Sequence, residues 1–191
     1  MRLVWQTFSI ILLVPIFLLL YNKTFAIKNK QQLDSNTGLQ NLRAFLLMIQ
    51  YAEGTLGPNA YRTLFGGRLI NSLEHHPNIT VTIGGFSSTA AGAYQFLYST
   101  WSNLQQTLRL TDFSPSSQDR AAVEIIWQKG ALADVLAGNT VAAIYKCRKV
   151  WASFPGAGYG QGEKSLDAMM KAYTLAGGQY INLHSNPAAG A

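Results

Sequence analysis

The stretch Leu39–Ala52 constrains the fold more than any other part of the chain, because it leads directly into a carboxylate, Glu53, and a glycine, Gly54. Its apolar side chains recur at steps of four and three residues, the spacing of one helical face: Leu42, Leu46 and Ile49. Glu53 follows Ile49 by four residues and extends this apolar stripe. Glycine at the next position favours a helix end. The sequence predicts a helix whose end holds a carboxyl group against apolar surroundings.

Three effects in this setting would raise the pKa of the Glu53 carboxyl. The apolar stripe removes it from water, the negative end of the helix dipole disfavours its charge, and no basic side chain is adjacent in sequence. A carboxyl that stays protonated near neutral pH is suited to general acid catalysis. The alternative is an ordinary surface glutamate near a frayed helix end, and the spacing alone leaves both interpretations open.

The charge balance limits the classes of partner. With 191 residues, the chain has room for one large domain, or for one domain and an extra segment. Its net charge is +6, but four of the fifteen basic residues lie among the first thirty residues, so the remaining eleven face nine acids. This weakly positive body argues against a nucleic-acid partner, and it suits an anionic polymer or a membrane surface.

Residues 1–26 differ in composition from everything that follows. Arg2 precedes a nearly continuous apolar run, Phe8–Tyr21, which would span about 21 Å as a helix, short of the ~30 Å hydrocarbon core. Thr24 and Ala26 are small residues suited to a cleavage site. We interpret residues 1–26 as a secretory signal peptide or a membrane anchor. The body is therefore predicted to be exported, either periplasmic or tethered to the inner membrane.

The remaining chain is divided into a polar linker over residues 27–38, a folded domain over residues 39–183 and a tail over residues 184–191. Further helical patterns cover Tyr94–Leu108, Ser114–Gly130, Ala131–Leu136, Thr140–Phe154 and Lys164–Ala176. In the second of these, Ser114 is suited to cap the helix and Pro115 to be its first residue. Strand patterns and a glycine turn cover Arg68–Leu73, Ile79–Ile83, Gly84-Gly85 and Tyr180–Leu183. These patterns predict a mostly helical α+β domain, and we find no internal repeats.

Other reactive side chains carry weaker signals. The single cysteine, Cys147, excludes an internal disulfide and is interpreted as a small buried apolar side chain. His75 and His76 lack a third ligand at metal-site spacing, so we expect a turn with exposed imidazoles and no metal. Several acids lie within or at the edges of helices, as caps or solvated charges: Asp119, Glu124, Asp134 and Asp167. No serine lies in the Gly-x-Ser-x-Gly elbow of a Ser-His-Asp hydrolase.

Two loop regions combine small residues with side chains that suit a sugar ligand. The candidate contacts are Tyr94, Gln95, Tyr159 and Gln161. For the first pair the alternative is a hairpin edge in which Tyr94 packs inside the fold. The second pair lies in a glycine-rich loop that lacks the Lys-Ser/Thr ending of a phosphate loop. Ordinary glycosidases use two carboxylates. One candidate acid without a clear partner indicates cleavage of a sugar chain in which the substrate supplies the nucleophile.

Five segments, in sequence order, resemble the bacteriophage lambda lysozyme (endolysin) family: Tyr51–Thr55, Thr89–Gln95, Asp112–Asp119, Gly130–Leu132 and Trp151–Gln161. They fall within Leu39–Tyr180, and the run Pro-Gly-Ala-Gly-Tyr-Gly-Gln is the most specific of them. The resemblance implies a lysozyme-like α+β fold with a groove between a mainly helical lobe and a small β-containing lobe. It also implies cleavage of the β-1,4 bond between N-acetylmuramic acid and N-acetylglucosamine in peptidoglycan, by lytic transglycosylation that leaves 1,6-anhydromuramic ends.

By the same resemblance, Glu53 protonates the leaving oxygen and then accepts the proton of the muramic acid 6-hydroxyl. The four loop residues above would line the groove. The implied partner is the peptidoglycan glycan strand, and the membrane if the N-terminal segment is uncleaved; we expect a monomer without cofactor or metal. The chain departs from the family at Ala93, where a basic residue is usual, and in its N-terminal segment. The alternatives are a hydrolytic muramidase (lysozyme) and a non-catalytic peptidoglycan-binding protein.

Overall fold

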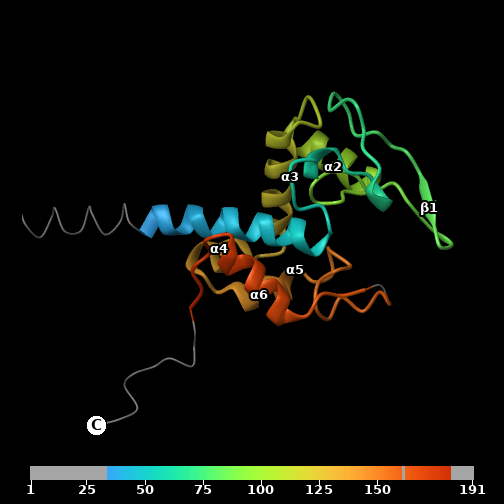
Figure 1. The fold of residues 1–191 in the computed structure, drawn as a ribbon. Helices are drawn as coiled ribbons and strands as arrows, with labels where there is room; N and C mark the ends of the chain where they lie inside the picture. The colour runs from blue at the N-terminus through green and yellow to red at the C-terminus, as the bar shows by residue number, and fades with distance from the viewer. Residues whose placement is uncertain (1–33, 161, 182–191) are drawn as a thin grey trace, which may run out of the picture. The chain divides into compact units, whose positions relative to one another are not determined.

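The computed structural model describes residues 34–160 and 162–181. The chain divides into two compact units, residues 1–37 and 38–191. The second unit contains all of the elements discussed below, and Figure 1 shows their order along the chain.

The structure describes only part of the N-terminal segment for which the sequence made predictions. Residues 1–26, interpreted as a signal peptide or membrane anchor, lie outside the described residues. Residues 34–38, assigned to a linker because they are polar, are helical. Polar side chains on the exposed side of a helix do not oppose helix formation, and residues 34–36 are exposed. Within the described ranges, no helix has the length and apolar content that crossing a membrane requires.

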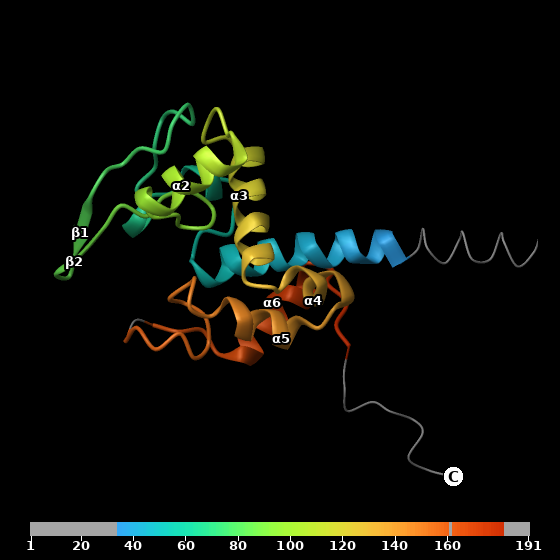
Figure 2. The same cartoon turned by 180° about the vertical axis from the view of Figure 1, so that it is seen from behind.

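A helix over residues 38–52, called the Glu53 helix below, runs through the centre of the second unit. Its most deeply buried side chains are Ala44, Phe45, Met48 and Ile49. Leu42 and Leu46, which the spacing placed on the buried stripe, are partly buried and pack against the core from its edge. In both views α4, α5 and α6 lie on one side of this helix, and α2 and α3 on the other (Figures 1 and 2).

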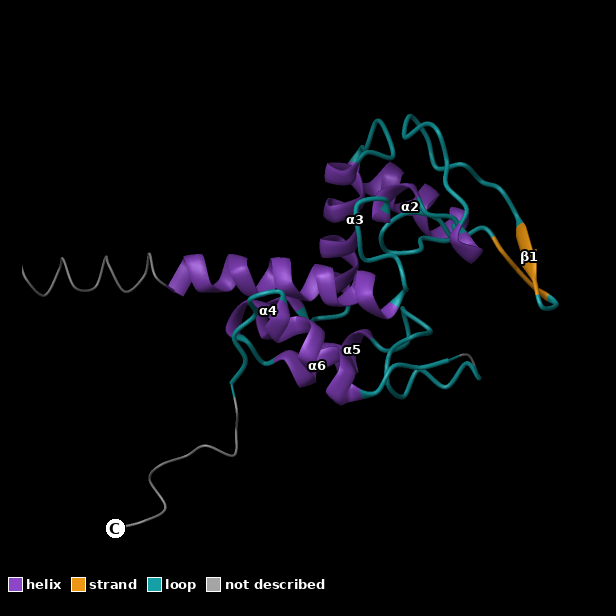
Figure 3. Cartoon of the chain, viewed as in Figure 1, coloured by secondary structure: helices purple, strands orange, loops and turns teal. Residues whose placement is uncertain are grey.

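Within the described residues the sheet is a single antiparallel hairpin of β1 (Val81–Ile83) and β2 (Phe86–Ser88) (Figure 3). Thr82 lies opposite Ser87 in the register. The predicted turn at Gly84-Gly85 joins the two strands, and the predicted strand before it is confirmed over its last three residues. The α+β class, mostly helical with a small sheet, is therefore confirmed.

The strand predicted over residues 68–73 does not form. Two short 3₁₀ turns, η1 (Ala60–Arg62) and η2 (Phe65–Gly67), precede this segment, and one isolated bridge joins Thr63 to Leu69. A β-branched or apolar run becomes a strand only when a neighbouring strand pairs with its backbone, and here the pairing is limited to that bridge. The predicted strand at residues 180–183 is likewise not formed at residues 180 and 181.

The helices after the hairpin are α2 (Tyr98–Leu108), α3 (Pro115–Gln128), α4 (Leu132–Ala137), α5 (Thr140–Cys147) and α6 (Leu166–Leu175). The predicted start of α3 is confirmed, because the Ser114 hydroxyl accepts the Ser117 N–H at 3.3 Å and Pro115 is the first helical residue. Gly138 ends α4 as predicted. Two bounds differ by more than two residues: α2 begins at Tyr98 instead of Tyr94, and α5 ends at Cys147 instead of Phe154.

Two residues with weak sequence signals lie in the core. Cys147 is buried as predicted, and burial raises the pKa of its thiol to about 12. His76 is 6% exposed, so the expected exposed imidazole is wrong at this position, although His75 is exposed. The His76 ring lies 4.9 Å from the Phe113 ring centroid, and its Nε2 is 2.8 Å from the Phe96 carbonyl oxygen. Burial lowers the pKa of this imidazole, which packs as part of the aromatic core.

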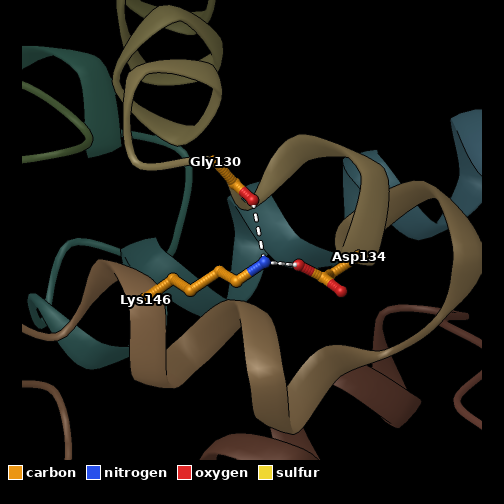
Figure 4. A network of polar contacts seen from close by, with 3 residues as sticks. All are labelled: Gly130, Asp134 and Lys146. Carbon is orange, nitrogen blue, oxygen red and sulfur yellow. Dashed lines mark hydrogen bonds and ion pairs between the residues drawn. The ribbon is translucent and has the colours of Figure 1, made fainter.

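A polar contact on the surface joins the helices of the C-terminal half (Figure 4). Lys146 on α5 donates to the Gly130 carbonyl at 3.0 Å and pairs with Asp134 of α4 at 2.5 Å. Asp134 was expected to be a helix cap or a solvated charge, and it forms an ion pair instead. Exposed pairs of this kind stabilise a protein by about 0–1 kcal/mol. The contact therefore links α5 to α4 but adds little to the free energy of unfolding.

Candidate active site

Glu53 lies directly after the Glu53 helix, as the sequence predicts. Its backbone N–H donates to the Ile49 carbonyl at 2.9 Å, which is the last helical hydrogen bond, and Gly54 then adopts a left-handed conformation with φ of 71°. A glycine adopts this conformation without the steric cost that a Cβ brings. The end of the helix is thus fixed, and the carboxyl group starts from a rigid backbone.

The Glu53 carboxyl is held by a segment one hundred residues away. The Ser153 hydroxyl donates to Glu53 Oε1 at 2.5 Å, and the Ser153 carbonyl accepts the Lys164 N–H at 2.7 Å. The Lys164 ammonium lies 5.6 Å from the Tyr51 ring centroid, on the last turn of the Glu53 helix. The carboxyl is therefore surrounded by the helix end, one hydroxyl donor and one nearby cation.

Burial is the largest influence on the acidity of this group, and it raises the pKa of Glu53 above its ordinary value. The Ser153 hydrogen bond and the Lys164 charge act in the opposite direction and lower the pKa by smaller amounts. The direction that the sequence predicted is confirmed. Glu53 has no basic neighbour in the sequence, but folding brings the Lys164 side chain near its carboxyl.

A second connection fixes the turn after Glu53. The Thr55 hydroxyl donates to the Ala93 carbonyl at 2.6 Å, and both residues are buried. The Ala93 N–H donates to Gln118 Oε1 at 2.9 Å, which links the same segment to α3. Ala93, the position where the resemblance expects a basic residue, is completely buried in this chain. It contributes backbone contacts and no side-chain contact to a ligand.

Tyr94 does not offer a face to a ligand. Its side chain is 1% exposed, and its hydroxyl donates to Asp119 Oδ1 at 2.5 Å. Tyr61 donates to the same carboxylate oxygen at 2.9 Å, and Gln50 Nε2 lies 3.5 Å from the Tyr94 hydroxyl. The prediction of a sugar-stacking Tyr94 is therefore wrong, and the alternative in which it packs inside the fold is correct. Asp119, expected to be an ordinary helix charge, anchors this buried network.

Gln95 uses its amide to stabilise a turn. It has a φ of 50°, and its Nε2 donates to the carbonyls of Thr63 and Gly92, both at 3.0 Å. Both amide hydrogens are therefore engaged within the protein, and the side chain is half-buried. These contacts leave only its carbonyl oxygen for a ligand.

The glycine-rich loop over residues 155–160 is organised by backbone contacts. Glu163 accepts the N–H groups of Gly156 and Gly158 at 2.8 and 2.6 Å, and these two bonds lower the pKa of its carboxyl. The Tyr159 hydroxyl donates to the Lys149 carbonyl at 3.0 Å, while the Tyr159 side chain remains 54% exposed. Tyr159 is thus an exposed ring on a loop held by hydrogen bonds, and its contact with a sugar stays a prediction. Gln161 lies outside the described residues.

Sequence reasoning missed three residues that shape this site: Ser153, Lys164 and Asp119. Ser153 lies within the Trp151–Gln161 motif, so the motif marked its segment without giving it a role. Asp119 likewise ends the Asp112–Asp119 motif, which gave it no role in the site. For Lys164, we find no sequence signal that distinguishes it from other charged residues. Among the described residues, no three histidine, cysteine or acidic side chains gather as a metal site.

The geometry gives a carboxyl group with a raised pKa, a hydroxyl donor, a nearby cation and an exposed aromatic ring on one loop. A protonated carboxyl of this kind can donate a proton to a leaving group and then exist as an anion beside the donor and the cation. This arrangement suits acid-assisted cleavage of a bond between two sugars, the chemistry that the sequence resemblance implies.

Comparison with known proteins agrees with this description. The family model named Endolysin matches residues 43–180. The endolysin of Escherichia phage P2 is 39% identical over 155 residues, which cover 73% of this chain and 94% of the relative. The endolysin of Escherichia phage lambda is 39% identical over 143 residues, covering 71% and 90%.

Solved structures give the same result. Bacteriophage lambda lysozyme complexed with a chitohexasaccharide matches with a TM-score of 0.72 at 38% identity, covering 74% of this chain and 97% of that one. A second structure of lysozyme from bacteriophage lambda matches with a TM-score of 0.68 at 37% identity. The chain therefore belongs to the endolysin family and has the lambda lysozyme-like fold.

Proposed function

We propose that this chain cleaves the β-1,4 bond between N-acetylmuramic acid and N-acetylglucosamine in peptidoglycan by lytic transglycosylation, with Glu53 as general acid and then general base. As a member of the endolysin family, the chain is a peptidoglycan-degrading enzyme of the lysozyme type. The observation that carries the finer proposal is the environment of Glu53, a carboxyl with a burial-raised pKa that is bonded to one hydroxyl.

The proposed reaction balances without water. The Glu53 carboxyl gives its proton to the glycosidic oxygen, and the bond between that oxygen and C1 of the muramic acid breaks. The 6-hydroxyl of the same sugar attacks C1, forms the 1,6-anhydro ether and releases its proton to the Glu53 carboxylate. The leaving strand ends in a free hydroxyl, and Glu53 returns to its protonated state.

The state of the other carboxylates supports a single-acid reaction. Asp119 accepts two tyrosine hydroxyls, and Glu163 accepts two backbone N–H groups. The influences on the Glu53 pKa are burial, the Ser153 hydroxyl and the Lys164 charge, and none of them comes from a second carboxylate among the described residues. A hydrolytic glycosidase would use a second carboxylate as nucleophile or base. The substrate's own 6-hydroxyl removes that requirement.

Ser153 and Lys164 are proposed to serve the second half of the reaction. After proton transfer, Glu53 is an anion in a site that burial makes unfavourable for charge. The Ser153 hydroxyl and the Lys164 ammonium both favour the charged form. They would therefore lower the energy of the state in which Glu53 waits to accept the proton of the 6-hydroxyl.

The proposed substrate implies a location. The lambda lysozyme structure that contains a chitohexasaccharide supports binding of a glycan strand here, with Tyr159 as an exposed contact. We propose that the chain is exported and acts as a monomer in the periplasm or tethered at the inner membrane. Residues 1–26 would supply export, as a signal peptide or an anchor, and N-terminal sequencing of the exported protein distinguishes these two cases.

The test compares Glu53→Gln with Glu74→Gln, an exposed glutamate away from the site. Glu53→Gln should reduce wall lysis by about 10²–10⁴-fold, because a glutamine has no proton to give, and the control should leave it unchanged. Mass spectrometry of the soluble products should find anhydro ends, which are lighter than reducing ends by one water. Reducing ends would identify a hydrolytic muramidase instead. Unchanged lysis by Glu53→Gln would overturn the catalytic proposal and favour a non-catalytic role.

A further inference from the structure

A cavity of ≈ 570 Å³ lies beside the proposed active site, between the start of α2, the end of α3 and the segment that carries Tyr159. The polar and aromatic side chains that line it are Thr100, Gln128, Lys129, Lys149 and Tyr159. Ala152 also lines it and is the direct neighbour of Ser153, which donates to Glu53. The volume falls within the range of ordinary ligand sites, about 300–1,000 Å³. One residue of the lining is thus adjacent in sequence to the residue whose hydroxyl contacts the acid.

The lining of this cavity has a positive charge that no acid on its walls neutralises. Lys129 is exposed, and its side chain has no hydrogen bond or ion pair with any described residue. The Lys149 ammonium donates one hydrogen bond to the Ala157 carbonyl at 2.5 Å and lies 5.6 Å from the Tyr159 ring centroid. Two of its three N–H donors remain for a ligand.

The acids near the cavity are already engaged. Glu163, the acid whose charge is coupled to Lys149, accepts two backbone N–H groups of the glycine-rich loop. Glu124 accepts the Gln128 amide at 2.9 Å, which turns that amide toward α3. Glu163 keeps its negative charge and offsets part of the Lys149 charge, but the lining itself contains two ammonium groups and no acid, which favours an anionic ligand group in direct contact with them.

We propose that this cavity binds a carboxylate carried by N-acetylmuramic acid, either on its lactyl group or on the peptide attached to it. The inference rests on the proposed function, which brings a glycan strand past Glu53. N-acetylglucosamine carries no charge, so carboxylates mark the muramic acid residues of the strand. Lys129 and Lys149 would therefore place a muramic acid at a fixed distance from Glu53 and set the register of cleavage, while Tyr159 contacts the sugar or peptide backbone.

The test measures binding in the Glu53→Gln background, so that cleavage does not enter. Dissociation constants are measured by calorimetry for three ligands: peptide-bearing glycan strands, strands stripped of peptide by an amidase, and neutral chitohexaose. Lys129→Gln should weaken binding of the charged ligands by about three- to tenfold and leave chitohexaose unchanged. Lys129→Arg should restore binding, and added salt should reduce the difference. The matched control is Lys171→Gln on α6, which lies outside this cavity.

The three ligands identify the source of the carboxylate. A loss confined to peptide-bearing strands assigns it to the peptide. A loss confined to stripped strands assigns it to the lactyl group, because the lactyl carboxyl is amide-bonded while the peptide is attached and is free only after the amidase has acted. A loss on both charged ligands shows that the cavity accepts either carboxylate. Lys149→Arg is the second variant; because it keeps the charge and the donor to Ala157, it should bind all three ligands as the Glu53→Gln parent does. For Lys129→Gln, equal losses on all three ligands, or no loss on any, would overturn the proposal. Failure of the proposed function is separate: it would appear as a wild-type chain that binds these strands but cleaves none of them.

Discussion

Substituting Gly92 by alanine should disrupt the connection between α3 and the segment that fixes Glu53. Gly92 has a φ of 79°, and a Cβ at this position would lie 2.8 Å from Gln118 Cδ and 2.9 Å from Phe113 Cζ, with Gln118 Oε1 closer still. Both side chains are completely buried. Neither has open space into which to move, so the clash cannot be relieved by a surface rotamer.

The expected loss of stability follows from the hydrogen bonds of the Gln118 side chain. Its Oε1 accepts the Ala93 N–H at 2.9 Å, and its Nε2 donates to the carbonyls of Tyr61 and Phe113 at 3.0 and 2.7 Å. A left-handed residue with a Cβ costs about 1–2 kcal/mol. Each buried polar group left without a partner costs about 1–3 kcal/mol. We expect Gly92→Ala to lower the free energy of unfolding by about 3–6 kcal/mol, out of a total of about 5–15.

Gly130→Ala provides the control, because Gly130 has a similar φ of 65° and its added Cβ would meet open space. Its loss should be limited to the backbone cost of about 1–2 kcal/mol. Urea unfolding followed by tryptophan fluorescence measures both variants, with wall lysis as a second readout. If the two variants lost the same stability within about 0.5 kcal/mol, the clash with Gln118 would contribute nothing and the reasoning would be refuted.

Three further predictions concern two acids and a hydroxyl of the site. Burial raises the pKa of Glu53, so the folded chain binds this proton more tightly than the unfolded chain does. The free energy of unfolding of the wild type, measured by urea titration, should therefore fall relative to that of Glu53→Gln as the pH rises above about 4.3. The pKa of Glu163 is lowered, so its charged form stabilises the folded chain. Glu163→Gln should therefore be less stable than the wild type at neutral pH and equally stable at low pH. If the stabilities of the two variants changed with pH in parallel, both assignments would be contradicted. Thr55→Val leaves the Ala93 carbonyl unpaired and should lose about 1–3 kcal/mol and much of the lytic rate, whereas Thr55→Ser should retain that rate; equal rates would show that the hydroxyl is not needed.

Features encoded by neighbouring residues were predictable from the sequence. The start of α3 at Ser114 and Pro115, the end of α4 at Gly138 and the hairpin turn each depend on a few consecutive residues. The position of Glu53 at the helix end was predictable for the same reason, because a helical pattern, the acid and the following glycine are contiguous. Local propensity and capping act at short range, so a single sequence carries them.

Features that depend on distant partners were not predictable. The sequence around Tyr94 suggested a ligand contact, but α3 places Asp119 against its hydroxyl. Residues 68–73 have the pattern of a strand, but their backbone pairing is limited to one isolated bridge. Ser153 and Lys164 reach Glu53 across one hundred or more residues, so spacing gave no indication of either. The long-range contacts therefore decide which polar residues serve the site and which serve the core.

The proposed reaction places opposite requirements on one carboxyl group, and the contacts that would meet them come from separate parts of the chain. An acid that donates first must be protonated at the start, which burial against the end of the Glu53 helix favours. The same group must exist as an anion in mid-reaction, which Ser153 and Lys164 favour. Burial without the two polar partners would hold the proton too tightly, and the partners without burial would leave no proton to give. Because one segment supplies burial and another supplies the hydroxyl and cation, each influence can be altered separately by substitution.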